Sequence, residues 1–397
     1  MGRSKKKSQE RSKAKKTHDV PEKPQLPPAD TQSSSRLMQL PGELRNQIYK
    51  HLFSSTRLTY GDRRTGRISS VKMKSALNSL AILRTCRQVH REAATLWPGL
   101  VLFNFEDVDA LLDRLSPLPA ETLSKIRYVR TRGHTLMLLP VGEEYNIYYR
   151  LAESLKLLPG LRLDTLTVLA PAHGTIAYDT LDGLINRGNG WKELHFITPN
   201  SEMLGFAKVE MFMMDPYWRK PQPSTWESAL LKRDSIIGST KATVTIYRST
   251  QADASGSIIN PHTRKLFTQP VPRNQDHPDF GVAADDALLA EKKELLVIAK
   301  RGQGADIAEQ TEPPFGTNDI REWAYGMTWA EIRRQCIDLH HDDEDFPSSD
   351  EDELLLSDED EESDEDDEDS SSMWKPKDNA QIDSYIHVDD VEWDFIE

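Results

Sequence analysis

Regular hydrophobic patterning begins with a helical spacing in the first quarter of the chain. From Leu40 to Leu52, apolar side chains recur at every fourth residue, which is the spacing of one helix face. Pro41 suits a first helical turn, because the N–H that it lacks would have no partner there. A second broad apolar face runs over 76–97 and is ended by Pro98. The pattern therefore predicts one helix over each stretch.

Beyond residue 99, short apolar runs alternate with helical stretches. We expect strands at 101–105, 126–130, 166–169 and 194–197, and helices at 108–115, 119–125, 147–158 and 178–187. Asp107 can cap the helix that follows it. Such alternation favours parallel strands joined by right-handed crossovers. The expected fold class is mixed α/β, with a body that resembles an irregular, short leucine-rich-repeat-like arrangement.

Two more strands are predicted at 243–247 and 295–299, and a last helix at about 318–340. The chain between these strands is rich in Pro, Asp and Ser, and a structureless loop of that length is uncommon inside a compact domain. We therefore expect the two strands to pair or to be neighbours, with 250–283 looped out as a disordered segment.

Charge is segregated along the chain, so the net charge of −14 describes no single part of it. Residues 3–16 carry a surplus of +7, whereas 342–369 hold nineteen Asp or Glu and no Lys or Arg. Both ends have too few apolar residues to offset the entropy of an ordered chain. We expect a disordered basic arm over 1–36 and a disordered acidic tail over 341–397. Between them we expect a helical module at 37–99 and an α/β body at 100–340.

Several classes of protein are disfavoured. No apolar run reaches the eighteen or more residues that a membrane span needs, and the N-terminus lacks the apolar core of a secretory signal. Cys86 and Cys336 are too far apart for a disulfide framework, and we expect Cys86 to be a buried packing residue. A nuclear or cytoplasmic location follows. The Lys-rich cluster within 5–16 is typical of a nuclear-import patch or of a solvated arm.

Catalytic motifs are missing from the sequence. It contains no nucleophile elbow, phosphate-binding loop or zinc-binding helix motif. His340 and His341 lie beside acidic residues, but without the supporting groups of a built metal site. The carboxylates of the tail are not fixed as general acid–base catalysis requires. We therefore expect neither an enzyme nor a cofactor or metal site.

Basic residues cluster in 54–75, which we interpret as a hairpin or loop insertion. The cations are Arg57, Arg63, Arg64, Arg67, Lys72 and Lys74, with Asp62 as the one acid. Such a cluster can neutralise the phosphates of a nucleic acid. A solvated loop is the favoured interpretation.

The acidic tail carries candidate phosphorylation sites. Acidic residues follow closely after Ser348, Ser349, Ser357 and Ser363, the pattern that acidophilic kinases prefer. The tail acts either as a solubiliser or as an arm that competes for basic surfaces, including histones or the insertion at 54–75. Its last residues alternate apolar and acidic side chains, which is typical of a segment that orders on a partner.

The two helical stretches together resemble an F-box. The first half reads LPGELRNQIYKHLF, the second LRTCRQVHREAATLW, and the pair in order is similar to a group of fungal F-box-like proteins. The resemblance implies docking on a Skp-type adaptor and thereby on a cullin–RING ubiquitin ligase, with a downstream domain that presents a substrate. The residues that it implies for adaptor binding are Leu40, Pro41, Leu44, Ile48, Leu52, Val89 and Trp97. The insertion at 54–75 departs from the family pattern.

The leading hypothesis is a non-enzymatic protein-interaction module that recognises substrates for such a ligase. One alternative is a nuclear chromatin- or nucleic-acid-associated factor that uses the basic arm and the acidic tail. Another is a scaffold that has lost adaptor binding. The helix at 40–52 could also pack as ordinary core, because a core helix shows the same spacing. The sequence names no substrate.

Overall fold

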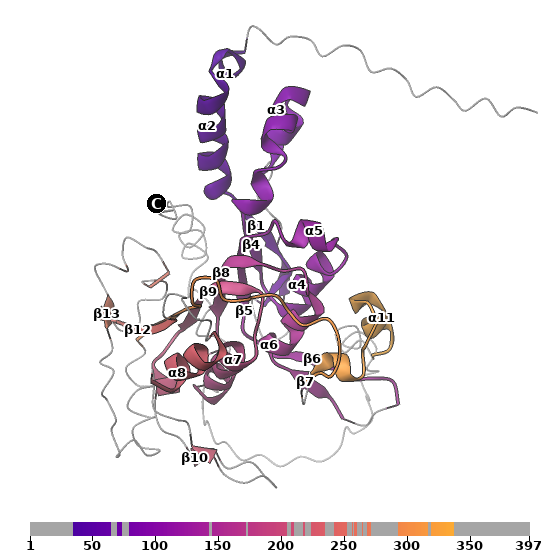
Figure 1. Cartoon of the computed structure of the whole chain (residues 1–397), viewed down its shortest axis with the longest axis vertical. Coiled ribbons are helices and arrows are strands. Elements are labelled where there is room, and N and C mark those ends of the chain that lie inside the picture. Colours follow the sequence, from indigo (N-terminus) through magenta and orange to yellow (C-terminus); the bar gives the residue numbers. More distant parts are fainter. Residues whose placement is uncertain are drawn as a thin grey trace, which may run out of the picture. The chain divides into compact units, whose positions relative to one another are not determined.

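A mixed sheet dominates the computed structural model (Figure 1). In the residues that the structure describes it has eight strands, in the order β1 (Arg57–Tyr60), β4 (Leu102–Phe105), β5 (Tyr128–Arg132), β8 (Leu163–Leu169), β9 (Trp191–Thr198), β14 (Leu295–Lys300), β12 (Thr243–Ser249) and β13 (Thr268–Pro270). The first five pair in parallel, and β14, β12 and β13 pair antiparallel. The mixed α/β class predicted from the sequence is confirmed.

The structure describes residues 35–64, 70–73, 79–142, 145–171, 174–204, 208–209, 217–218, 224–234, 242–251, 256, 258–259, 264, 268–270, 293–316 and 319–336. The chain divides into two compact units, Met1–Pro41 and Gly42–Glu397. In the first unit the described residues form the short helix α1 (Arg36–Gln39). All the other elements named below belong to the second unit.

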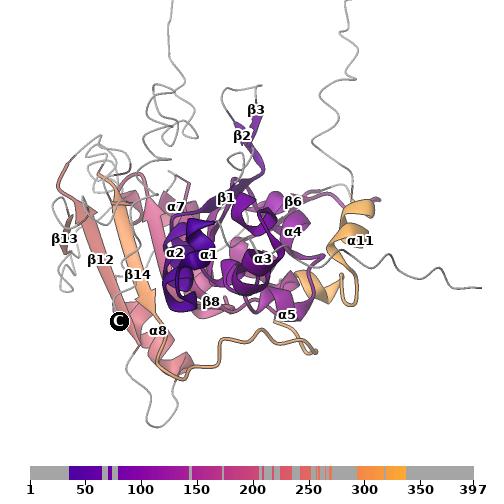
Figure 2. The ribbon, with the colours of Figure 1, turned by 90° about the horizontal axis from the view of Figure 1, so that it is seen from above.

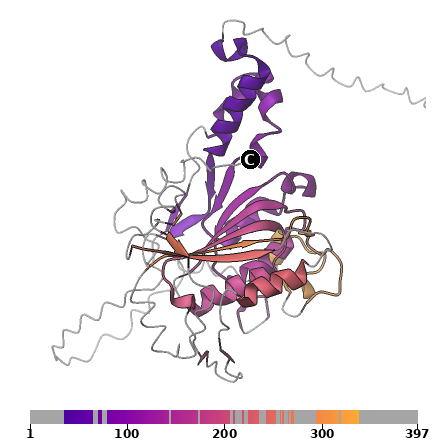
Figure 3. The ribbon, with the colours of Figure 1, turned by 60° about the vertical axis from the view of Figure 1, so that its left-hand side comes forward.

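Parallel strands that follow one another in chain order place their crossovers on one face. Each new parallel strand is added at the same edge of the sheet. When every crossover is right-handed, all the connections then lie on the same side of the sheet. The helices of these connections are α4 (Val108–Leu115), α5 (Ala120–Leu123), α6 (Leu151–Ser154) with its 3-10 continuation η3 (Leu155–Leu157), α7 (Gly174–Asn186) and, after β9, α8 (Ser224–Arg233). Helices α4, α6, α7 and α8 contact one another in that order and form a layer along one side of the sheet (Figure 3).

The core lies between the sheet and this helix layer. One row of side chains runs across the five parallel strands in register, and all its members are apolar and buried: Leu58, Phe103, Val129, Leu166 and Leu194. Because successive side chains of a strand point to opposite faces, the residues beside this row belong to the other face of the sheet.

Smaller elements complete the second unit. They are α2 (Gly42–Ser54), β2 (Asp62–Arg64), β3 (Ser70–Lys72), η1 (Ala81–Arg84), α3 (Arg87–Ala93), η2 (Trp97–Gly99), β6 (Leu136–Leu138), β7 (Ile147–Tyr149), η4 (Glu202–Leu204), β10 (Lys208–Val209), β11 (Tyr217–Trp218), η5 (Ile320–Glu322) and α11 (Trp329–Arg334). Helix α2 contacts α3 and η2, and α11 lies beside α4 (Figure 2). The pairs β2–β3, β6–β7 and β10–β11 are two-stranded antiparallel ribbons.

Most of the predicted strands are confirmed, and so are several helices. The helix predicted at 108–115 is α4, and Asp107 caps it by accepting a hydrogen bond from the backbone N–H of Ala110. The strands predicted at 243–247 and 295–299 are β12 and β14, which pair as expected.

Two predicted long helices are wrong. The stretch 76–97 contains η1 and α3, because Cys86 adopts an extended conformation between them and its thiol accepts a hydrogen bond from the N–H of Val89. Cys86 is accordingly a half-buried cap and not a buried packing residue. The stretch 318–340 contains η5 and α11, separated by Gly326 at a φ of 76° and by the capping box of Thr328.

Two other assignments also need correction. The helix predicted over 147–158 begins as strand β7, and only its second half is helical, as α6 and η3. The insertion predicted over 54–75 does contain a hairpin, β2–β3, but its first residues form β1, an edge strand of the main sheet. Within the loop predicted over 250–283, residues 268–270 form β13.

Candidate protein-interaction surfaces

Helix α2 buries Arg45, Tyr49 and Phe53 on one side and leaves three aliphatic side chains exposed on another. Leu44, Ile48 and Leu52 are 45%, 40% and 37% exposed, and their spacing puts them on one side of the helix. We call these three residues the exposed stripe. Arg45 and Tyr49, by contrast, are buried. Tyr49 and Phe53 thus give α2 an ordinary packed face, and the exposed stripe is apolar surface that this packing leaves uncovered.

A charged contact with α3 explains this orientation. The Arg45 guanidinium donates two hydrogen bonds to Glu92, Nε to Oε2 at 2.9 Å and Nη2 to Oε1 at 2.6 Å. The Tyr49 hydroxyl donates a third to Glu92 Oε2 at 3.1 Å. Hydrogen bonding from Arg45 lowers the pKa of Glu92 to about 2, and burial together with the Glu92 contact raises the pKa of Tyr49 to about 12. A bidentate pair of this kind fixes which side of α2 faces α3.

The two residues that link helix α2 to β1, Ser55 and Thr56, are both hydrogen-bonded. The hydroxyls of Ser55 and Thr56 donate to the carbonyl of Leu52 at 3.0 Å and 2.7 Å, which binds both residues to the end of the helix. The carbonyl of Thr56 then accepts a hydrogen bond from the N–H of Leu102, the first residue of β4. Hydrogen bonds therefore connect the last turn of α2 directly to β1 and β4.

The other residues implied for adaptor binding have different surroundings. Val89 is buried on α3, so its side chain supports the helix pair from inside. Trp97 is half-buried, and its ring lies 6.0 Å from that of Phe103 on β4. Leu40 and Pro41 belong to the separate unit Met1–Pro41.

A row of buried polar side chains lies on the sheet face opposite the helix layer. Its central positions are polar and in register across five strands: Thr59, Asn104, Arg130, Thr167 and His195. We call them the polar row. Each of these side chains is between 4% and 8% exposed. Sequence reasoning missed the row, although a polar residue interrupts each predicted apolar run, as Asn104 does between Phe103 and Phe105.

Hydrogen bonds connect neighbours within the polar row. Arg130 Nε donates to Asn104 Oδ1 at 2.6 Å, and Asn104 Nδ2 donates to Thr59 Oγ1 at 3.4 Å. Two residues further along the strands, on the same face, Arg132 forms an ion pair with Glu106 at 3.3 Å. These contacts join polar side chains of neighbouring strands, which lie about 4.8 Å apart.

A coupled charge cluster lies at the far end of the row. His195 Nε2 is 2.6 Å from Glu193 Oε1, and Lys300 Nζ is 3.1 Å from Glu193 Oε2. Burial lowers the pKa of His195, which favours its neutral form. Burial would raise the pKa of Glu193, but the contacts with His195 and Lys300 outweigh it and lower this pKa to about 2. The Glu193 carboxylate is therefore ionised at neutral pH.

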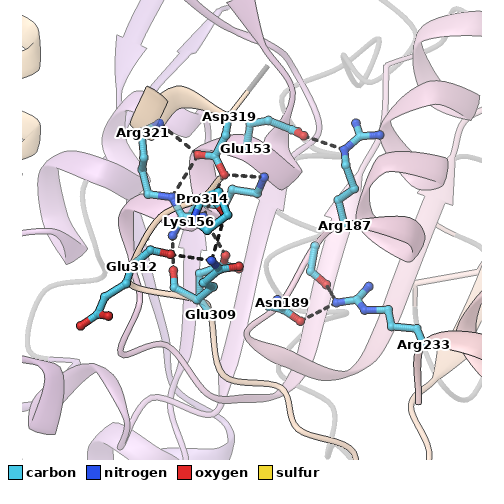
Figure 4. A network of polar contacts seen from close by, with 12 residues as sticks. Glu153, Lys156, Arg187, Asn189, Arg233, Glu309, Glu312, Pro314, Asp319 and Arg321 are labelled. Atoms are coloured by element: carbon cyan, nitrogen blue, oxygen red, sulfur yellow. Dashed lines mark hydrogen bonds and ion pairs between the residues drawn. The ribbon is translucent and has the colours of Figure 1, made fainter. Parts of the chain in front are cut away.

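A third polar cluster is structural (Figure 4). Lys156 Nζ lies 2.9 Å from Asp319 Oδ2, and Arg321 pairs with both Asp319 and Glu309 at 2.8 Å and 3.0 Å. Arg321 also donates to the carbonyl of Gln310. The cations stabilise the Asp319 carboxylate against the effect of burial and lower its pKa to about 2. These contacts fasten the segment 301–322 to η3.

The predicted polyanion-binding residues are spread over different parts of the chain. Arg57 belongs to β1 of the main sheet, Arg63 and Arg64 to β2, and Lys72 to β3. The remaining candidates lie outside the described residues: Arg67, Lys74 and the four tail serines Ser348, Ser349, Ser357 and Ser363.

Within the described part of the chain, no three His, Cys, Asp or Glu side chains gather as metal ligands. None of the described helices is long and apolar enough to cross a membrane. The chain matches no protein-family model, no curated protein and no solved structure.

Proposed function

We propose that this chain is a non-enzymatic, F-box-like substrate-recognition subunit of a cullin–RING ubiquitin ligase. The exposed stripe of α2 would dock on a Skp-type adaptor. The five parallel strands in chain order, which we interpret as an irregular leucine-rich-repeat-like body, would carry the surface that presents a substrate. The proposal extends the resemblance of the two helical stretches to the F-box.

The exposed stripe of α2 carries the proposal. Three large apolar side chains remain in water on the outer side of the helix, while Arg45 is held inside by Glu92. Burying the exposed parts of the stripe against a partner would contribute on the order of 3 kcal/mol. Apolar side chains that anchor an interface in this way usually account for much of the binding energy.

Binding of the purified full-length chain to a fungal Skp-type adaptor, measured by calorimetry, tests the proposal. We expect Leu44→Asp/Ile48→Asp to weaken binding at least about tenfold, because two carboxylates would be desolvated at the interface. The control is Asn46→Asp/Lys50→Asp, which also places two carboxylates at exposed positions of α2 away from the stripe and changes the net charge by −3, against −2 for the stripe variant. We expect the control to bind as the wild type does.

Both double variants should keep the thermal unfolding midpoint of the wild type, because the substituted positions are exposed. The proposal fails if the folded wild type shows no adaptor binding, or if the control variant loses affinity to the same extent as the stripe variant.

A further inference from the structure

The two-stranded ribbon β6–β7 has one buried face and one exposed apolar face. Leu136 and Leu138 of β6 are buried, as is Tyr149 of β7. Met137 and Tyr148, which lie directly opposite each other in the ribbon, are 38% and 61% exposed. Opposite residues of an antiparallel pair share a face, so these two side chains form an apolar pair on the outer side. Two strands alone form a marginal sheet, and a third strand beside them would stabilise it.

The chain that follows α11 meets the ribbon just beyond β6. Pro140, two residues after the end of β6, forms an antiparallel bridge with Cys336. The N–H of Val141 donates to the carbonyl of Gln335 at 2.8 Å. Because the bridge is antiparallel, residues that continue in an extended conformation after Cys336 run back along β6.

Backbone alternation shows which groups of β6 lie at this edge. In a strand, the N–H and C=O of one residue point to one edge, and those of the next residue point to the other edge. The N–H of Val141 faces the segment that contains Gln335, so the backbone groups of Met137 face the same edge and those of Leu138 face β7. In the part of the chain that the structure describes, β7 is the one strand of the ribbon that pairs with β6. The edge at Met137 can therefore receive a further strand.

Residues 337–340 have the pattern of such a strand. Counted from the bridge, Leu339 falls opposite Met137 and Asp338 opposite Leu138. The side chain of Leu339 would then join the outer apolar pair, as cross-strand neighbours do. Asp338 would point to the inner side of an edge strand, where a charge discourages the pairing of any further strand.

We propose that residues 337–340 add to the open edge of β6 as a third, antiparallel strand. Leu339 and Met137 exchange both backbone hydrogen bonds, and the Leu339 side chain packs beside Met137. The segment is thus an intramolecular ligand that binds by strand addition. It withholds this edge from the strands of other molecules, and it gives the acidic residues 342–369 a fixed starting point on the ribbon. The inference does not depend on whether α2 binds an adaptor.

Hydrogen–deuterium exchange of the full-length chain, resolved to single amides, tests the proposal. The Met137 amide should be protected in the wild type. Leu339→Pro removes an N–H that faces β6, and we expect it to speed the exchange of Met137 at least about tenfold. Asp338→Pro is the matched control, because the N–H that it removes points away from β6, where an edge strand tolerates proline, and we expect a change of less than about twofold.

The Leu138 amide is an internal reference in these experiments. It faces β7, so it should keep its protection in all three proteins. If Leu339→Pro also exposes Leu138, then Leu339→Gly provides the test. Glycine keeps the N–H but weakens a strand, and Met137 should then exchange about threefold faster while Leu138 stays protected.

Three results overturn the proposal. A Met137 amide that exchanges in the wild type as fast as an unstructured peptide would show that no strand is added. Equal acceleration by the two proline variants would contradict the register. Protection of Met137 that survives Leu339→Pro and rises with protein concentration would assign the edge to a second copy of the chain.

Discussion

Arg45 determines which side of α2 is available to a partner. The residue is 9% exposed, and its guanidinium is held by both oxygens of Glu92. Rotating α2 to bury Leu44 and Ile48 would move this guanidinium toward the water and break the bidentate pair. The ion pair therefore selects how α2 packs on α3. It favours the packing that buries Arg45 over a rotated packing that would bury Leu44 and Ile48 instead.

Glu92→Gln tests this contact. The amide keeps the shape of the side chain but leaves Arg45 with a neutral partner, so we expect the free energy of unfolding to fall by about 1–2 kcal/mol at neutral pH. Because the pKa of Glu92 is lowered in the folded state, its contribution is complete above its ordinary pKa of 4.5 and is lost as the pH falls toward about 2.

Urea unfolding of the two proteins at several pH values measures this difference. The stability gap between wild type and Glu92→Gln should shrink from pH 6 to pH 2.5, and a constant gap would rule out the ion pair as its source. Gln88→Ala is a control, because Gln88 donates to the exposed side of the same carboxylate at 3.1 Å. Its effect should be smaller.

The sequence predicted the spacing of the exposed stripe but not its direction. Leu44, Ile48 and Leu52 have the same periodicity whether they face a core or a partner. What decides between the two is the pairing of Arg45 with Glu92, 47 residues away in the chain. Local pattern contains no information on such a distant contact, and for the same reason the polar row was missed.

At the scale of elements, the sequence features that correctly predicted a helix or strand are those with a short-range physical cause. Asp107 precedes an amphipathic run, and its carboxylate caps α4 as predicted. The signals that failed are breaks inside long apolar patterns. Thr85 ends η1, and Cys86 caps α3 with its thiol, a group that is not among the preferred N-caps. Periodicity continues through such a break, so the sequence predicted one helix where there are two.

Substitutions of Asp107 test whether its carboxylate stabilises α4 as an N-cap. Asp107→Ala removes the acceptor of the Ala110 N–H, which lies 2.5 Å from Oδ1, and we expect a loss of about 1–2 kcal/mol in the free energy of unfolding. Asp107→Asn should lose clearly less, because an Asn side chain also caps helices. Urea denaturation compares the three proteins, and equal losses in both variants would contradict a capping role.

At the scale of the whole molecule, buried ion pairs connect distant parts of the chain. Lys156 and Asp319 are separated by 163 residues, and Arg301 pairs with Asp234 at 2.6 Å deep in the structure. Together these pairs fasten the segment that returns from β14 along the helix layer. The sequence could not reveal them, because each consists of ordinary charged residues in segments without periodicity.

Asp319→Asn should destabilise the fold strongly. The substitution leaves Lys156 buried without its counter-charge, which costs about 3–5 kcal/mol. Asp113→Asn is the matched control, because Asp113 forms an exposed pair with Arg333 and such a pair contributes less than about 1 kcal/mol. Chemical denaturation of both variants measures the contrast, and similar losses would show that burial does not govern these pairs.

The hydrogen-bonded passage from α2 through Thr56 to β1 has a mechanical consequence. No residue between the helix and the strand is left to act as a pivot, since Ser55 and Thr56 are both bonded to the helix end and Thr56 also to β4. A torque applied to α2 is therefore transmitted to the edge of the sheet. Whatever holds the helix thus also fixes the orientation of the sheet that bears the polar row, and the distance between the exposed stripe and this row is built into the fold.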